Sequence, residues 1–159
     1  MRRLSIVMAA VLAAVGLGSL VAANPAGAAV NGVACQHVAG TLSGNVTLAS
    51  CHPAASFPFP PQPGKGSMPG SVLVGTSSGT INWTQGKHSY ATAITITTAL
   101  APNPGRGWCA RKGSIPYYVT GTVTGSTHPD IAVGSSVSGR LCISAASAVM
   151  QSHYGGISL

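Results

Sequence analysis

Residues 79–98 read GTINWTQGKHSYATAITITT, and this stretch decides the fold class. At its centre, Gln85 to His88 has the composition of a tight turn. On both sides of the turn apolar and polar residues alternate, with Ile81 and Trp83 before it and Ile94 after it. A repeat of two residues is that of a β-strand with one buried face, whereas a helix repeats every 3.6 residues. The stretch therefore predicts an antiparallel β-hairpin.

The same alternation recurs elsewhere in the chain. It is present from Val38 to Ala49, from Tyr117 to Thr124 and from Val137 to Ile143. Thr, Val and Ile dominate these stretches and Gly or Pro separates them, as in sheets of several short strands. We therefore predict an all-β protein, an antiparallel Ig-like β-sandwich of two packed sheets. A small closed barrel is the alternative, and residues 145–154 fit either a short helix or a last strand.

Two loops rich in proline or glycine carry the candidate binding residues. Residues 52–70 contain six prolines, which remove ladder donors, so we predict a surface loop or linker there. The loop from Ala101 to Ser114 brings aromatic and positive side chains close together in sequence. The alternative for the aromatic residues is packing, against the sheet or over a disulfide. The predicted binding surface consists of Phe57 and Phe59 in the first loop and Arg106, Trp108, Arg111 and Lys112 in the second.

The N-terminus has the composition of a secretory signal peptide. Two arginines precede an apolar run from Ile6 to Ala23, and Ala26-Gly27-Ala28 then supplies the small residues of a cleavage site. We predict that residues 1–28 are removed and that 29–159 form a single secreted domain, extracellular or associated with the cell envelope. The alternative is a retained membrane anchor, because the apolar run is nearly long enough to span a bilayer.

Four cysteines lie in the part of the chain that is predicted to be exported. An even number in an oxidising compartment predicts two disulfides. Three pairings are possible, and we favour Cys35 with Cys51 and Cys109 with Cys142, because partners near in sequence meet most easily in a meandering β chain. In the chain-entropy model loops of these lengths contribute about 3 and 4 kcal/mol. A zinc site is not expected, since no Cys-x-x-Cys pair is present.

Asp130 is the only acidic residue of the chain, against eight Lys and Arg residues. Six of these basic residues follow the predicted signal peptide, so the exported domain carries a positive charge. Such a charge attracts an anionic glycan, an acidic lipid or an extracellular protein partner in a salt-dependent manner. Nucleic acid is not the expected partner, because no nucleic-acid motif is present and aromatic residues are not interleaved with basic ones.

The shortage of carboxylates also limits catalysis. Ordinary glycoside hydrolysis needs two carboxylates, and divalent-metal chemistry needs several oxygen ligands. A serine hydrolase would have to combine Asp130 with a histidine such as His128, yet no Gly-x-Ser-x-Gly motif is present. Metal binding by His37 with His52, or by His128 with Asp130, has no supporting spacing. We therefore predict a protein without catalytic residues, cofactor or metal, which binds an anionic component of the cell envelope.

The chain resembles two known groups of secreted proteins. The Ala-rich leader, the Thr- and Gly-rich strands, the four cysteines and the Gly-Thr-x-x-Trp strand ending at Trp83 resemble the small secreted β-proteins of unknown function in actinobacteria. This resemblance implies no activity. The two disulfides in sequence order are similar to those of the secreted subtilisin-inhibitor family, which implies a protease-binding loop at residues 109–113. The chain departs from that family in having little strand before Cys35 and a longer segment between Cys51 and Cys109.

Overall fold

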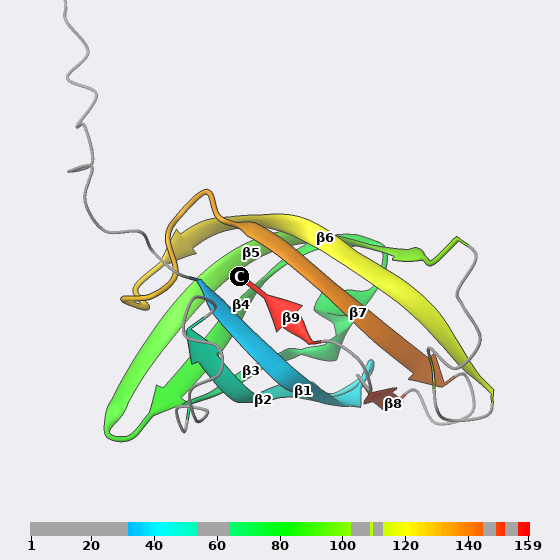
Figure 1. The fold of residues 1–159 in the computed structure, drawn as a ribbon, viewed down its shortest axis with the longest axis horizontal. Coiled ribbons are helices and arrows are strands. Elements are labelled where there is room, and N and C mark those ends of the chain that lie inside the picture. The colour runs from blue at the N-terminus through cyan, green and yellow to red at the C-terminus, as the bar shows by residue number, and fades with distance from the viewer. Residues whose placement is uncertain (1–31, 54–63, 103–108, 110–112, 145–148, 152–155) are drawn as a thin grey trace, which may run out of the picture.

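The structure is a computed structural model, and it describes residues 32–53, 64–102, 109, 113–144, 149–151 and 156–159. In this part of the chain nearly all residues belong to strands, joined by one short 3-10 helix (Figure 1). The strands are β1 (Val33–Thr41), β2 (Asn45–Pro53), β3 (Gly64–Pro69), β4 (Thr76–Gln85), β5 (His88–Leu100), β6 (Ser114–Ser126), β7 (Ser136–Ser144), β8 (Val149–Gln151) and β9 (Ile157–Ser158), and the 3-10 helix η2 is Gly70–Leu73.

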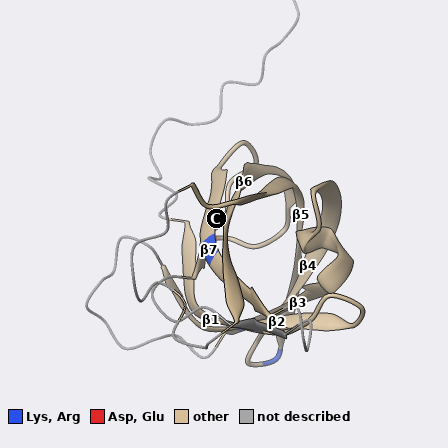
Figure 2. Cartoon of the chain, turned by 90° about the vertical axis from the view of Figure 1, so that its right-hand side faces the viewer, with Lys and Arg blue, Asp and Glu red and all other residues tan. Residues whose placement is uncertain are grey.

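The strands form one closed antiparallel sheet. From β1 to β7 each strand pairs with the next along the chain, and β8 and β9 each pair with β7 on one side and β1 on the other. The two short strands therefore share the eighth position of a closed eight-stranded barrel. Figure 2 shows the strands arranged as a ring, with little of the ribbon basic or acidic.

The predicted all-β antiparallel class is confirmed, and so are the hairpin at residues 79–98 and both disulfides. The β-sandwich is not the arrangement observed. The single sheet closes on itself, which corresponds to the alternative of a small barrel. Alternation along a strand shows only that one of its faces is buried, and this holds in a sandwich as well as in a barrel. The two architectures differ in whether the last strand pairs with the first.

Two segments differ from the sequence-based expectation or complete it. Gly64–Pro69 is strand β3, although the prolines of residues 52–70 predict a loop. The prolines nearest to it permit this, because Pro63 precedes the strand and Pro69 is its last residue, so the ladder donors between them remain. Met68, the single large apolar residue of the strand, is buried. In the ambiguous stretch 145–154, Val149–Gln151 is a strand.

The N-terminal part of the chain gives no structural test of export. Residues 1–31 lie outside the described residues, so the signal peptide remains a prediction. In the described part of the chain no helix is long and apolar enough to cross a membrane. The two disulfides indicate an oxidising environment.

The inside of the barrel is filled by side chains. The inward positions of the alternating strands hold the predicted apolar residues, and Trp83 is only 2% exposed. In an eight-stranded barrel the interior is just wide enough for such side chains to fill it. The most deeply buried of these residues are Val46, Leu48, Met68, Leu73, Ile81, Ile94, Ile96, Val119, Val123, Leu141 and Ile157.

Hydroxyl groups cover much of the outer face. Thr76 and Thr97 lie opposite each other on β4 and β5, and their Oγ1 atoms are 3.1 Å apart. One row further along, Ser78 Oγ and Thr95 Oγ1 are 2.8 Å apart. Such cross-strand pairs stabilise the sheet while they keep its surface uncharged.

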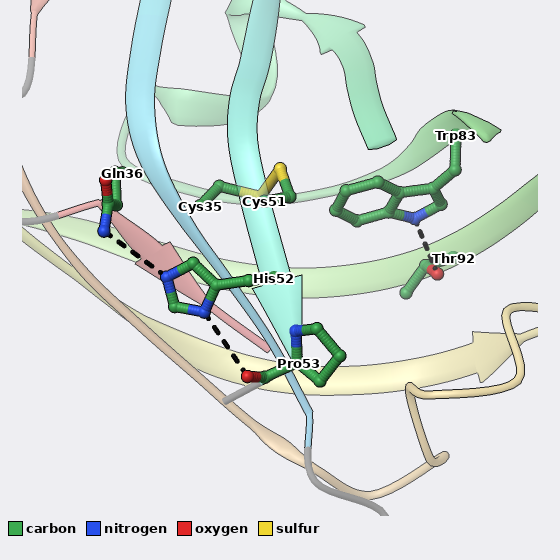
Figure 3. Close-up of a disulfide and its surroundings, with 7 residues drawn as sticks. All are labelled: Cys35, Gln36, Cys51, His52, Pro53, Trp83 and Thr92. Carbon is green, nitrogen blue, oxygen red and sulfur yellow. Dashed lines mark hydrogen bonds between the residues drawn. A yellow bond between two sulfur atoms is a disulfide. The ribbon is translucent and has the colours of Figure 1, made fainter. Parts of the chain in front are cut away.

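The two disulfides occupy different faces of the sheet. Cys35 and Cys51 lie directly opposite each other on β1 and β2, and both belong to the core (Figure 3). Cys142 follows the core residue Leu141 on β7, so its side chain points to the outer face, where it is bonded to Cys109. One disulfide thus joins two neighbouring strands inside the barrel, and the other ties Cys109 to its outside.

Because the sheet closes into a ring, we predict that two glycine positions differ sharply in whether they tolerate a side chain. A Cβ atom on Gly156 would lie 1.3 Å from the carbonyl oxygen of Cys35, whereas one on Gly64 would meet nothing within 4 Å. We expect Gly156→Ala to lower the free energy of unfolding by about 2 kcal/mol or more, because the backbone must move away from β1. Gly64→Ala is the matched control. Urea unfolding followed by tryptophan fluorescence measures both, and equal stabilities would contradict the close approach of this segment to β1.

Candidate functional site

All six predicted binding residues lie outside the described part of the chain. The strand ends that flank them are described, and they lie at opposite ends of the barrel. The segment with the two phenylalanines leaves β2 where β4 also ends, which we call the histidine end. The segment with Trp108 and the three cations leaves β5 and enters β6 at the other end, which we call the mouth. Outside the described residues are Phe57, Phe59, Arg106, Trp108, Arg111 and Lys112.

A buried polar network organises the histidine end. The indole Nε1–H of Trp83 donates to Thr92 Oγ1 at 3.0 Å, as Figure 3 shows. Thr92 Oγ1 is also 3.1 Å from Ser126 Oγ, which accepts from the backbone N–H of His128 at 3.1 Å. The Trp83 and Tyr90 rings each pack against the imidazole of His128 in a T-shaped arrangement, with ring centroids 5.4 and 5.0 Å away. The polar groups of this network thus hold the turn after β6.

His128 is 8% exposed and sits beside the only acid of the chain. Its Nδ1 accepts from the backbone N–H of Asp130 at 3.2 Å, which leaves the proton of the neutral ring on Nε2. Burial lowers the pKa of His128, and the Asp130 carboxylate, 4.0 Å away, acts in the opposite direction. The hydroxyl of Ser126 accepts a hydrogen bond from the backbone N–H of His128. The hydrogen bonds of Ser126, His128 and Asp130 are thus those of a turn that stabilises the fold.

His52 occupies the same end. Its Nδ1–H donates to the Pro53 carbonyl oxygen at 3.3 Å, and its Nε2 accepts from Gln36 Nε2 at 3.4 Å (Figure 3). The cavity between His52, Trp83 and His128 has a volume of about 30 Å³, which is room for a water molecule or two. Across the described residues, no three His, Cys, Asp or Glu side chains lie close enough to share a metal ion.

A larger hollow lies on the outer face of β6, β7 and β9. Its volume is about 450 Å³, within the range of small-ligand sites. The hollow is found where the eighth position of the barrel is occupied by β9, a strand of two residues. We call it the Arg140 hollow; its outward side chains are Tyr118, Thr120, Ser138, Arg140 and Ser158, with Gly156 at its edge.

The strand register brings these side chains together. Tyr118 on β6 lies opposite Arg140 on β7, and both side chains are exposed. In the next row, Thr120, Ser138 and Ser158 lie side by side on three neighbouring strands. The Arg140 backbone N–H donates to Gly156 O at 3.3 Å, which holds the middle of β7 against the residue that precedes β9.

This combination suits a polar, anionic ligand. A guanidinium binds a carboxylate or phosphate with two parallel hydrogen bonds. The three hydroxyls both donate and accept hydrogen bonds, and the Tyr118 ring offers an apolar face with a polar tip. Sequence reasoning missed this site because its residues are far apart in the chain. The available signal was Arg140 itself, a cation at an outward position of a strand whose other outward residues are mostly serine.

Comparison with protein-family models, curated proteins and solved structures finds no match for this chain. The loop at 109–113, which a protease inhibitor would present to its target, is described only at Cys109 and Gly113, and the inhibitor hypothesis stays a prediction.

The buried imidazole predicts a pH-dependent stability. Because the pKa of His128 is lowered in the folded state, the unfolded chain binds a proton more readily below pH of about 6.5. Above that pH the ring is neutral in both states, and the folded protein keeps its full stability. This stability is lost as the pH falls from about 6.5 through the lowered pKa of the folded state, because protonation of His128 then favours the unfolded chain. His128→Asn keeps an oxygen that accepts from the Asp130 N–H and does not titrate. We expect the melting temperature of the wild type to fall more between pH 7.5 and pH 5 than that of His128→Asn. Parallel curves would contradict the assignment.

Proposed function

We propose that this protein is a secreted, non-catalytic binding protein of the extracellular space or cell envelope, and that its ligand is an anionic glycan. The observation that carries the proposal is the Arg140 hollow, which Arg140, Tyr118 and three hydroxyl side chains line together. Two disulfides suit a protein that works in an oxidising environment outside the cytoplasm.

The charge of the chain supports an anionic ligand. Asp130 is the only carboxylate side chain, and it lines the small cavity at the histidine end and not the Arg140 hollow. No acidic side chain therefore repels an anion that enters the hollow. After the predicted signal peptide the chain has six Lys and Arg residues against one Asp, and this excess adds a long-range attraction that weakens as salt rises.

The hydroxyl row supports a sugar as the bearer of that negative charge. Thr120, Ser138 and Ser158 present one hydroxyl per strand, at the strand spacing of about 4.8 Å. Sugar hydroxyls match such groups as hydrogen-bond partners, and a carboxylate or phosphate on the sugar would bind the guanidinium. The packed interior directs the ligand to this outer face, because core side chains fill the space between the strands.

A charge-matched pair of variants tests the proposal. Arg140→Ala removes the guanidinium of the hollow, and Lys65→Ala removes the same charge from an exposed position on β3. Since a hydrogen bond to a charged group contributes about 1.5–3 kcal/mol, Arg140→Ala is expected to weaken binding at least tenfold. Lys65→Ala is expected to change it less than about twofold. Isothermal titration with oligogalacturonate provides the measurement, and its methyl ester is the uncharged comparison ligand.

The outcomes separate a built site from a general charge effect. Arg140→Lys should give intermediate affinity, because it keeps the charge and loses the paired hydrogen bonds. Equal weakening by Arg140→Ala and Lys65→Ala would show that only net charge matters and would refute the proposed site. Equal affinity for the acid and the ester would exclude an anionic ligand.

A further inference from the structure

We infer that the mouth of the barrel docks on the surface of an anionic lipid bilayer. An open apolar cup of about 120 Å³ lies at the mouth, the end of the barrel where β5 ends and β6 begins. Exposed apolar side chains stand around it. Val74 is 56% exposed, Leu100 63% and Ile115 41%. The cup is lined by Leu42, Leu73, Val74, Gly75, Thr98, Tyr117 and Ile143.

The cup is apolar because inward-facing apolar residues continue along the strands past the buried core, toward the mouth. On β5 the inward residues are Ile96, which is buried, then Thr98, which is half-buried, and finally Leu100. Leu100 lies opposite Tyr117 on β6, and Ile115 lies opposite Ile143 on β7. The strands thus place apolar side chains at inward positions where the described residues no longer cover them.

Three large exposed apolar residues at one end are unusual for this surface. The outer face of the barrel is mainly hydroxyl, and exposed apolar clusters mark interaction sites. Apolar tips of this kind enter the boundary between lipid headgroups and acyl chains, to a depth of about 5–10 Å. The cup itself has room for the end of one acyl chain, because its volume approaches that of a cavity that holds benzene.

The charge distribution favours an anionic bilayer. The only acid, Asp130, lies at the histidine end, so no acidic side chain at the mouth repels negative headgroups. After the predicted signal peptide the chain has six Lys and Arg residues against this one acid. Their net positive charge attracts an anionic membrane surface in a salt-dependent manner. An uncharged apolar partner would gain nothing from this charge.

Two equally exposed apolar residues give a matched test. Leu100 at the mouth and Val133 at the histidine end are both 63% exposed. Flotation of the protein with vesicles of phosphatidylglycerol and phosphatidylcholine in equal parts measures docking, and pure phosphatidylcholine vesicles are the control. We expect Leu100→Asn to weaken binding about tenfold, in line with the loss of one buried leucine side chain. Val133→Asn is expected to bind like the wild type.

A second variant changes the cup in the opposite direction. Thr98 Oγ1 is buried and has no hydrogen-bond partner among the described residues. Thr98→Val replaces it by a methyl group of similar size, so the variant should fold at least as stably as the wild type. Because the cup becomes more apolar, we expect vesicle binding to be equal or stronger. Weaker binding by a stably folded Thr98→Val would contradict an apolar occupant.

Other occupants of the mouth give different results. Failure of the wild type to bind the anionic vesicles, or equal binding by Leu100→Asn and Val133→Asn, would overturn the inference. Binding of monomeric decanoate without binding of vesicles would show a site for single chains and would also overturn it. A dimer in sedimentation velocity that Leu100→Asn dissociates would overturn it as well and would assign the mouth to a second copy of the chain. Glycan binding through Arg140 is measured separately and is unaffected by these outcomes.

Discussion

The closure of the sheet between β7 and β1 is the constraint on which the rest of the structure depends. An open sheet would leave two edges with unpaired N–H and C=O groups. Here the edges are joined by only two short strands, β8 and β9, and by the mutual backbone hydrogen bonds of Val33 and Leu159 at 2.8 and 2.9 Å. The fit is tight, since Gly156 leaves no space for a side chain beside Cys35. The Cys35–Cys51 disulfide then fixes β1 to β2 next to this junction.

Closure also decides where a ligand can bind. With eight positions the ring is narrow, and core side chains such as Leu48, Ile94 and Leu141 occupy it. The space left for a ligand is therefore on the outside and at the ends of the barrel. The short β9 leaves a hollow beside β7, where Arg140 lies, and the incomplete cover at the end of β5 leaves the apolar mouth. At the histidine end, by contrast, the imidazole of His128 packs against Trp83 and Tyr90 and leaves a cavity of only about 30 Å³.

Much of the fold was predictable from the chain, and much less of the candidate site. Alternation correctly assigned Ile81, Trp83 and Ile94 to the buried face, and proximity in sequence favoured both disulfides. Strand β3 was missed because its sequence, GKGSMP, has a single large apolar residue and lies among prolines. The predicted binding loops lie outside the described residues. The pairing of Tyr118 with Arg140 was not predicted, because the sequence of one strand does not determine its register with the neighbouring strand.

The sequence by itself determined the antiparallel strands and the face that each one buries, and it favoured the observed partners of the four cysteines, since these depend on local alternation and on short separations along the chain. The tertiary structure alone decided that the sheet is a ring and not a sandwich. It also decided which outward residues become neighbours. The closure of the ring and these neighbours both depend on contacts between residues far apart in sequence, above all those that join β7 to β1 through the last residues of the chain. A local sequence pattern does not specify such contacts.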